Sequence, residues 1–160
     1  RVIATARNAD SAEELRALGA DEFIVLQQDT VALTARFRDE IANGVNVVLD
    51  YLWGPSAEAL LNAATGHGSS EAAPRIRFVN IGSLGGAEIA INAGMLRSSG
   101  VELLGSGLGS LSHAALIRSI ASLMQVVHSA GLKIAALPRP LADVERMWLE
   151  TGSARIVFTL

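Results

Sequence analysis

The sequence is organised around residues 75–110, a stretch that repeats one pattern twice. An apolar run at residues 76–81 ends in a glycine-rich segment, and a second run, from Val101 to Leu104, does the same. Such short apolar runs are typical of buried strands. The residues between them can form the crossover of about a dozen residues that parallel strands require, with Asn92 placed to cap a short helix. The repeat therefore predicts two parallel strands with glycine-rich exits.

Those exits are a candidate binding edge. Parallel neighbours in an open sheet place their carboxyl ends at one edge, and ligands bind in the crevice outside that edge. Glycine at such a position allows a ligand to approach the main chain closely. The alternative is that each glycine segment is only a tight turn, but two of them in succession favour a binding edge.

The rest of the first 111 residues alternates between strand and helix patterns. Strands are expected over residues 1–6, 22–26 and 45–49, and the helices that follow the first two are expected to be capped by Ser11 and Thr30. The third strand runs into a bend, after which a helix extends to about residue 64. This β-α alternation predicts the α/β class, with a doubly wound parallel sheet.

The last 50 residues carry a long helix and a separate piece of structure. Ser112 is expected to cap a helix that extends to about residue 130. Its apolar stripe is expected to face a core, and it consists of Leu116, Ile120, Leu123 and Val127. Beyond it we expect a strand over residues 133–137 that Pro138 and Pro140 end, a helix near Asp143, and a final strand over residues 155–160.

Composition excludes several classes of function. The chain has 160 residues, no cysteine and a formal net charge of -3, and its 13 Lys and Arg residues form no cluster. Disulfides and thiolate metal sites are therefore excluded, and a nucleic-acid partner is not expected. The absence of cysteine is compatible with a reducing cytoplasm, where we expect the protein. No apolar run approaches the roughly 20 residues that span a bilayer, so we expect no membrane partner. The sequence starts inside a predicted strand, and we expect it to be an N-terminally truncated fragment.

The sequence offers no catalytic residue and no metal ligand that we can name. Its histidines, His67, His113 and His128, are far apart and match no metal-ligand spacing. No nucleophile-elbow motif occurs. The segment after Leu104 is similar to a dinucleotide fingerprint, but Ser110 stands at its sixth position, and Gln125 stands where an acid is required.

A succession of motifs resembles one family along essentially the whole chain. These are RVIATARNADSAEELRALGADEFI, LDYLWGPSAEALLNAA, FVNIGSLGG, LLGSGLGS and LADVERMWLETGSARIVFTL, in this order. They resemble the cofactor-binding half of a medium-chain dehydrogenase/reductase, the superfamily of zinc-type alcohol dehydrogenases and quinone oxidoreductases. The resemblance implies a Rossmann-type sheet that lacks its first strand and pyrophosphate loop. It implies a partial NAD(P)-binding domain over residues 1–131 and a C-terminal segment over 132–160 that packs with the absent catalytic domain.

The resemblance also implies a set of cofactor-binding residues at the strand exits. The first exit would face the adenosine ribose, the third would line the cofactor cleft, and the two glycine-rich exits would lie along the nicotinamide. Arg155 would reach the cofactor phosphates, or else would be a solvated charge. The set is Ala6, Arg7, Asn8, Tyr51, Leu52, Trp53, Ile81, Gly82, Ser83, Leu104, Gly105, Ser106 and Arg155. Catalytic groups and any zinc ligands would lie outside this chain, which alone is expected to be inactive.

The first strand exit predicts a preference for NADP(H) over NAD(H). NAD-selective strands usually end in Asp or Glu, which binds the ribose 2′-hydroxyl. Here Ala6 occupies that position and Arg7 follows it, a cation able to bind a 2′-phosphate through two hydrogen bonds. The alternative is that a bent turn brings the carboxylate of Asp10 to the ribose and leaves Arg7 in solvent.

We expect an enzyme that transfers hydride between NAD(P)(H) and a small-molecule alcohol, aldehyde, enone or quinone. The alternative is a non-enzymatic NADP(H)-binding protein or subunit on the same fold. A methyltransferase-like α/β domain is a third possibility, ranked below these. The apolar strand from Val101 to Leu104 should lie at the outer edge of the sheet, and we expect it to pair with its copy in a homodimer.

Overall fold

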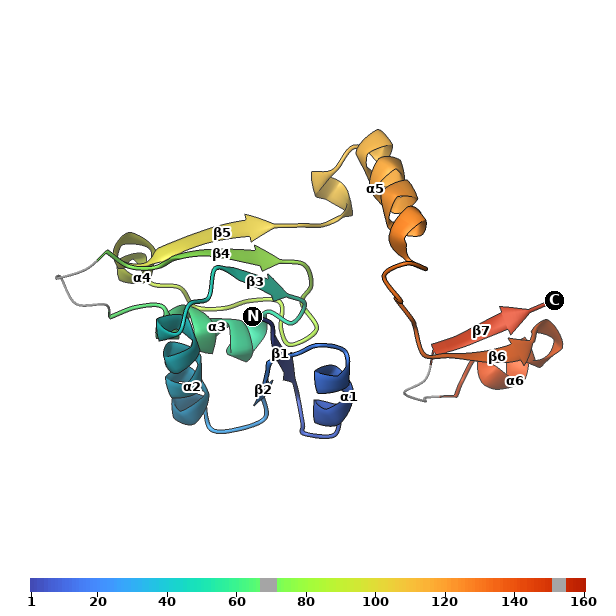
Figure 1. Ribbon diagram of the computed structural model, residues 1–160, viewed down its shortest axis with the longest axis horizontal. Helices are drawn as coiled ribbons and strands as arrows, with labels where there is room; N and C mark the ends of the chain where they lie inside the picture. Colours follow the sequence, from blue (N-terminus) through green and yellow to red (C-terminus); the bar gives the residue numbers. More distant parts are fainter. Residues whose placement is uncertain (67–71, 151–154) are drawn as a thin grey trace. The chain divides into compact units, whose positions relative to one another are not determined.

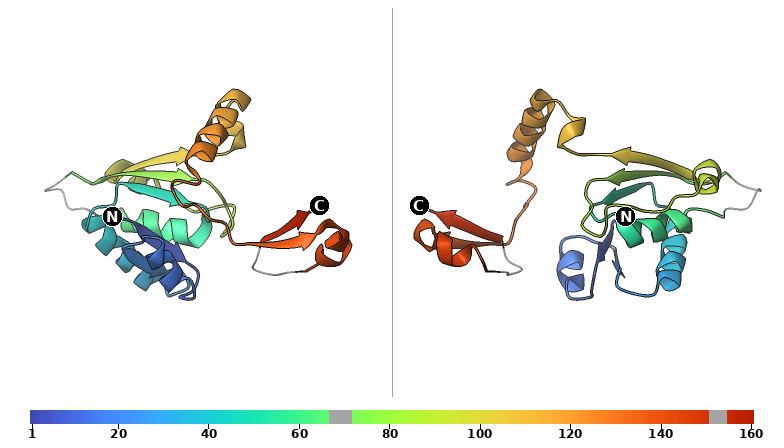
Figure 2. Two further views of the ribbon diagram at one scale, coloured as in Figure 1. Left: turned by 45° about the vertical axis from the view of Figure 1, so that its right-hand side comes forward. Right: turned by 180° about the vertical axis from the view of Figure 1, so that it is seen from behind.

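The computed structural model describes residues 1–66, 72–150 and 155–160, and the chain separates into two compact units, Arg1–Ser110 and Leu111–Leu160. Figures 1 and 2 show the elements of each unit. The predicted division at residue 131 concerned the role of the C-terminal segment and stays a prediction.

The first unit alternates strands and helices as predicted. Its elements are β1 (Ile3–Ala6), α1 (Ala12–Ala17), β2 (Glu22–Val25), α2 (Thr30–Ala42), β3 (Val47–Asp50), α3 (Gly54–Ala63), β4 (Arg75–Asn80), α4 (Ala93–Ser98), β5 (Gly100–Gly105) and a 3-10 turn, Leu108–Ser110. Every strand pair is parallel, including β4 with β5, whose crossover contains α4. The prediction from the repeated pattern is confirmed.

The strands of this unit form two sheets, β1–β2 and β3–β4–β5. Strands β1 and β3 each have one partner among the described residues, so each has a free backbone edge. The family resemblance implies a sheet without its first strand, and in the usual Rossmann order 3-2-1-4-5-6 that strand would lie between these two. The observed break in the sheet lies at this position.

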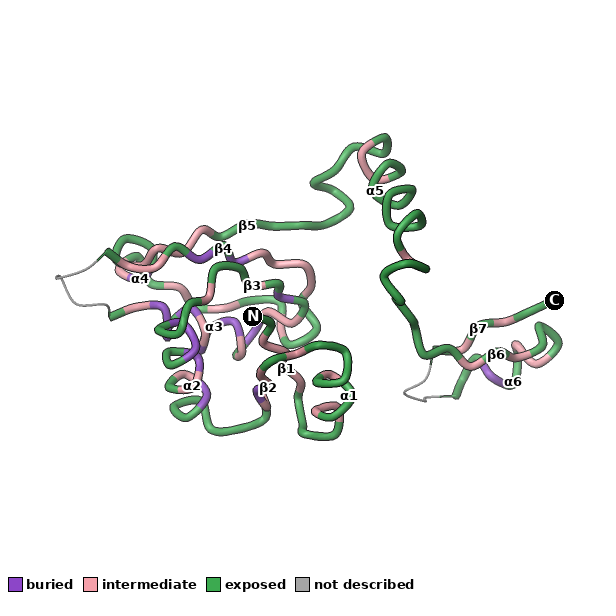
Figure 3. Tube along the Cα trace, in the orientation of Figure 1, coloured by how far each residue is buried: buried purple, intermediate pink, exposed green. Residues whose placement is uncertain are grey.

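Helices α2 and α3 form the main core. Leu33, Phe37 and Ile41 follow at intervals of four residues on α2 and are all buried, because this spacing places them on one face of the helix. They pack with Ala59 and Ala63 of α3 and with residues of β2 and β4. Figure 3 shows the buried segments of α2 and α3 side by side. The small alanine side chains allow the two helices to approach closely.

The remaining core lies on β4 and its neighbours. Phe78 of β4, 1% exposed, packs with Ala57 and Leu61 of α3 and with Met95 of α4. Helix α3 thus contributes to both clusters. It connects the β1–β2 part of the unit to the three-stranded sheet, although the two sheets share no strand pairing.

A buried ion cluster joins the start of the chain to α2. Glu40 is 3% exposed, and its carboxylate lies 2.6 Å from Arg1 Nη2 and 2.6 Å from Arg36 Nη2. Arg36 also donates to Glu22 of β2. Glu40 Oε2 is close to Arg1 without the alignment of a hydrogen bond, so this contact is an ion pair only. Losing either arginine would leave a buried carboxylate poorly compensated.

Arg75 and Arg77 of β4 face Glu102 of the paired strand β5. The hydrogen bond from Arg75 lowers the pKa of Glu102, and charge from both arginines acts in the same direction. Since the pKa is lowered on folding, this contribution to stability is present above the usual carboxyl range and is lost as the pH falls. The residues are partly exposed, so the contribution is small.

The helix caps were predicted with mixed success. Asn92 Oδ1 accepts from Met95 N at 2.8 Å, and Ser112 Oγ accepts from Ala115 N at 3.2 Å, as expected. The predicted cap Thr30 is wrong, because Asp29 occupies that position and accepts from the first amides of α2. Aspartate is at least as good a cap as threonine, and its charge favours a helix N-terminus. Ser11 is the N-cap of α1, but its side chain accepts no capping bond.

The second unit contains α5 (His113–Val126), β6 (Ala136–Pro140), a 3-10 turn Leu141–Asp143, α6 (Val144–Met147) and β7 (Arg155–Thr159). Helix α5 has no buried residue, and Ile120 and Leu123 of its stripe are exposed. Within the described residues, the prediction that this stripe lies in a core is therefore wrong. An amphipathic pattern shows that a face is apolar, but it does not show what covers that face.

Strand β6 contradicts the prediction that prolines end it. It contains Pro138 and Pro140 and pairs in parallel with β7. Residues two apart direct their backbone nitrogens to the same edge of a strand. Two prolines at this spacing can therefore both face the unpaired edge, where a missing N–H is tolerated.

No helix among the described residues has the combination of length and apolar character needed to cross a membrane.

Candidate functional site

The candidate site lies where β3, β4 and β5 end. Asp50, the last residue of β3, pairs with Asn80, the last of β4, and Asn80 pairs with Gly105, the last of β5. Because the strands are parallel and in register, their three exits leave the sheet side by side (Figure 1). The sheet thus brings together the predicted site residues at positions 51–53, 81–83 and 104–106.

The exits of β3 and β4 are joined by backbone hydrogen bonds. Ile81 N donates to Asp50 O at 2.6 Å, and Gly82 N donates to the same oxygen at 3.2 Å. Gly85 N donates to Leu52 O at 2.6 Å. The loops that follow β3 and β4 are therefore packed against each other, backbone to backbone, at the carboxyl end of the sheet.

This contact gives the glycine of the first glycine-rich exit a packing role. A Cβ on Gly82 would lie 2.6 Å from Tyr51 O, and a Cβ on Gly54 would lie 2.5 Å from Gly85 O. The close approach of the neighbouring loop therefore requires glycine at these positions, whatever their role toward a ligand. The second glycine-rich exit differs, since a Cβ on Gly105, Gly107 or Gly109 would have nothing within 4 Å. Its backbone is accessible to a ligand.

Two polar side chains that sequence reasoning missed organise these loops. The carboxylate of Asp50 accepts from the backbone amides of Leu52 and Trp53. The side-chain amide of Asn80 donates to Asp50 Oδ2 at 3.3 Å and to Gly82 O at 2.8 Å. An aspartate at the end of a strand, directly before a bend, signals a side chain that bonds to the backbone two residues on.

Trp53 has a strained backbone at the exit of β3. Its φ of 56° and ψ of -155° lie in a region that only glycine occupies readily. Its amide is held by Asp50, and its ring meets Phe78 edge to face, with the ring centroids 6.1 Å apart. The surrounding contacts therefore impose this conformation, and such strain is concentrated at functional sites.

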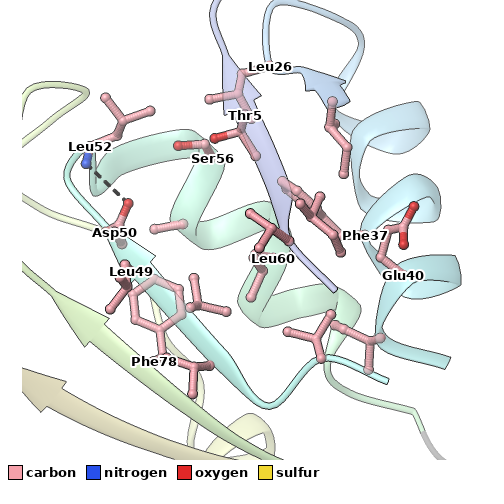
Figure 4. Close-up of a pocket in the computed structure, with 18 of the residues that line it drawn as sticks. Thr5, Leu26, Phe37, Glu40, Leu49, Asp50, Leu52, Ser56, Leu60 and Phe78 are labelled. Atoms are coloured by element: carbon pink, nitrogen blue, oxygen red, sulfur yellow. Dashed lines mark hydrogen bonds between the residues drawn. The ribbon is translucent and has the colours of Figure 1, made fainter. Parts of the chain in front are cut away.

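A cavity of about 830 Å³ opens between the free edges of β1 and β3. Figure 4 shows Thr5 of β1, Phe37 of α2, Leu60 of α3 and Phe78 of β4 around it. The residues around the cavity are mostly apolar, and in the usual Rossmann order the place between β1 and β3 is that of the first strand.

Four of the predicted cofactor-binding residues line this cavity together: Ala6, Arg7, Tyr51 and Leu52. The cavity thus brings the first and third exits to one site. The other predicted residues of the first unit do not line it, namely Asn8, Trp53, Ile81, Gly82, Ser83, Leu104, Gly105 and Ser106. Arg155 is an exposed residue of β7 in the second unit. The cofactor role of all these residues stays a prediction.

The exit of β1 presents an exposed cation. Ala6 is the last paired residue of β1, and Arg7 follows it with its carbonyl bonded to Gln27 N at 3.0 Å. In the described part of the chain, the side chain of Arg7 makes no ion pair. Asn8 Oδ1 accepts from Asp10 N at 3.2 Å, so the turn after Arg7 is ordered by its own side chain.

The described residues hold no group of three His, Cys, Asp or Glu side chains that could bind a metal ion. His113 and His128 are exposed, and His67 lies outside the described residues.

We compared the chain with known proteins to identify its fold. No protein-family model and no curated protein matches the sequence. Solved structures do match. A quinone oxidoreductase from Pseudomonas syringae pv. tomato is 24% identical, with a TM-score of 0.68, over 98% of this chain and 49% of its own. A mycobacterial protein complexed with NADPH is 22% identical, with a TM-score of 0.66, over 91% and 44%. The CurK enoyl reductase is 19% identical, with a TM-score of 0.59, over 91% and 42%.

These similarities establish the fold. The chain has the Rossmann-type α/β fold of the parts of these structures that it matches, and it spans less than half the length of the three proteins described. The predicted fold class is confirmed, and so is the predicted resemblance at the level of the fold.

Proposed function

We propose that this chain is the cofactor-binding part of an NAD(P)(H)-dependent oxidoreductase that acts on an alcohol, aldehyde, enone or quinone. The observation that carries this proposal is the meeting of three strand exits at the carboxyl edge of a parallel sheet. The similar structures support it, because one is named a quinone oxidoreductase and another is complexed with NADPH.

The residues present fit such a cofactor. The accessible backbone after Leu104 offers hydrogen-bonding groups for a carboxamide, and Arg7 offers a cation at the exit of β1. Tyr51 and Leu52, at the exit of β3, would line the cofactor cleft, as the family resemblance implies. The nicotinamide supplies the hydride, while the chain supplies binding and orientation. Zinc dependence and the cytoplasmic location stay predictions.

The first test measures binding and turnover in the protein that contains this chain. We expect saturable binding of NADPH and NADPH oxidation that depends on an added quinone, enone or aldehyde. Isothermal titration calorimetry and loss of absorbance at the nicotinamide band measure the two. Binding without turnover on any of these substrates would favour the non-enzymatic alternative. Absence of binding of either nicotinamide cofactor would contradict the proposal as a whole.

A second prediction concerns assembly. Strand β5 is the outer strand of its sheet, and its Leu103 and Leu104 are 38% and 47% exposed. An apolar edge strand invites pairing with another chain. We propose that β5 meets its copy across a twofold axis in a homodimer.

The L103K/L104K double variant should shift the protein from dimer to monomer, because it places two like charges on each side of the paired edges. Analytical ultracentrifugation measures the mass. The control is Leu18→Lys, at an exposed leucine just after α1, which should leave the dimer intact. A dimer that survives the double change would place the contact elsewhere.

A further inference from the structure

The side chain of Asp50 contacts hydrogen-bond donors with both of its oxygens. Oδ1 accepts from Leu52 N and Trp53 N, both at 3.1 Å, and Oδ2 accepts from Trp53 N at 3.0 Å and from Asn80 Nδ2 at 3.3 Å. The residue is 9% exposed, so water offers little replacement for these partners. A carboxylate matches this set of donors, and a side-chain amide does not, because its NH₂ would face another donor.

Asn80 extends the contact to the other two exits. Its side chain donates to Gly82 O at 2.8 Å, on the exit of β4. Its backbone carbonyl accepts from Ser106 N at 2.8 Å, on the exit of β5. One carboxylate and one asparagine therefore contact all three loops that leave this edge of the sheet. Figure 4 shows Asp50 at the side of the cavity, bonded to the amide of Leu52.

The turn after β3 would relax without these bonds. Trp53 has a φ of 56°, a conformation that a bulky residue keeps only when its surroundings enforce it. Two of the enforcing contacts are the bonds from its amide to Asp50. If the carboxylate is lost, the backbone from Tyr51 to Trp53 can return to ordinary angles, and the wall of the cleft changes shape.

We propose that Asp50 and Asn80 are a positioning pair whose side chains hold the exits of β3 and β4 in the shape that binds the dinucleotide, an inference that rests on the proposed function. Neither side chain has to touch the cofactor for this role. The pair acts through the backbone of Leu52, Trp53 and Gly82, which are themselves among the predicted cofactor contacts.

The test is Asp50→Asn in the protein that contains this chain. The variant keeps the shape of the side chain but presents an NH₂ group to Trp53 N or to Asn80. We expect a folded protein, by far-UV circular dichroism, with NADPH affinity reduced by about 10-fold or more, as expected for losing one charge-assisted bond. Hydrogen exchange at the amides of Leu52 and Trp53 should accelerate, while exchange in α2 stays unchanged.

The matched control is Asp29→Asn. Asp29 also accepts two backbone amides, from Val31 at 2.9 Å and Ala32 at 3.2 Å, but it uses a single oxygen, Oδ1. An asparagine can supply that oxygen and caps helices equally well, so both readouts should match the wild type. If Asp50→Asn fails to fold, Asn80→Ala is measured instead, since it removes only the bridging amide.

The outcomes separate this inference from the proposed function. Wild-type NADPH affinity in Asp50→Asn, or a loss no larger than that of Asp29→Asn, overturns the positioning role. If the wild-type protein binds no nicotinamide cofactor, the proposed function fails. The positioning role of Asp50 and Asn80 is then tested by amide hydrogen exchange alone. Faster exchange at Leu52 and Trp53 would still support the pair as the device that shapes the loops, and unchanged exchange would overturn it.

Discussion

Replacing Arg7 with alanine is expected to weaken NADP(H) binding by about 10- to 150-fold, the equivalent of one charge-assisted hydrogen bond of about 1.5 to 3 kcal/mol. NAD(H) binding should change little, because NAD(H) has no 2′-phosphate to bind the guanidinium. The wild-type protein should accordingly prefer NADP(H). The reason is the missing acid at the end of β1, where Ala6 stands.

The structure gives this prediction a geometric basis. Arg7 is exposed and has no ion-pair partner among the described residues that would have to be displaced. The competing possibility involves Asp10, whose carboxylate could bind a ribose in place of Arg7. Its backbone amide is already held by Asn8, in a turn that Arg7 precedes.

The measurement is the dissociation constant of each cofactor at fixed salt, for the wild type and for Arg7→Ala. Arg16→Ala is the control, because Arg16 is an exposed arginine on α1 and its loss changes the net charge equally. An equal loss for both cofactors would show that Arg7 does not bind the 2′-phosphate. A wild-type preference for NAD(H) would assign the ribose to Asp10 or to another group.

Much of the fold could be predicted because its signals are local. The spacing of Leu33, Phe37 and Ile41 specifies a helix with one buried face, and that face is buried. The two apolar runs that end in glycine predict parallel strands, since the residues between them are enough for the crossover that a parallel pair requires. Asn92 and Ser112 each precede a helix and cap it.

The features that could not be predicted depend on residues far apart in the sequence. Asp50 and Asn80 meet only because β3 and β4 pair in a particular register. The role of Gly82 depends on how closely the backbone at Tyr51 approaches it. The exposure of Ile120 depends on what covers α5, and a single helix pattern carries no such information. Propensity indicates which segments are strands or helices, and the register of the sheet then determines the site.

The contact between the two loops leads to the last prediction. Gly54 has a φ of 62°, and a Cβ there would lie 2.5 Å from the carbonyl oxygen of Gly85, which is backbone and cannot rotate away. Gly54→Ala should therefore combine left-handed strain of about 1 to 2 kcal/mol with a forced shift of one loop. We expect a total loss in the free energy of unfolding of about 3 kcal/mol or more, together with weaker NADPH binding.

Gly19→Ala separates the two contributions. Gly19 also has a positive φ, of 105°, but a Cβ there would have nothing within 4 Å. Its variant should lose only the conformational part, about 1 to 2 kcal/mol, and should bind NADPH as the wild type does. Urea denaturation of both variants measures the difference. If Gly54→Ala loses no more stability than Gly19→Ala, the two loops can separate at little cost. The close packing of residues 82–86 on the exit of β3 would then not be the reason for glycine at position 54.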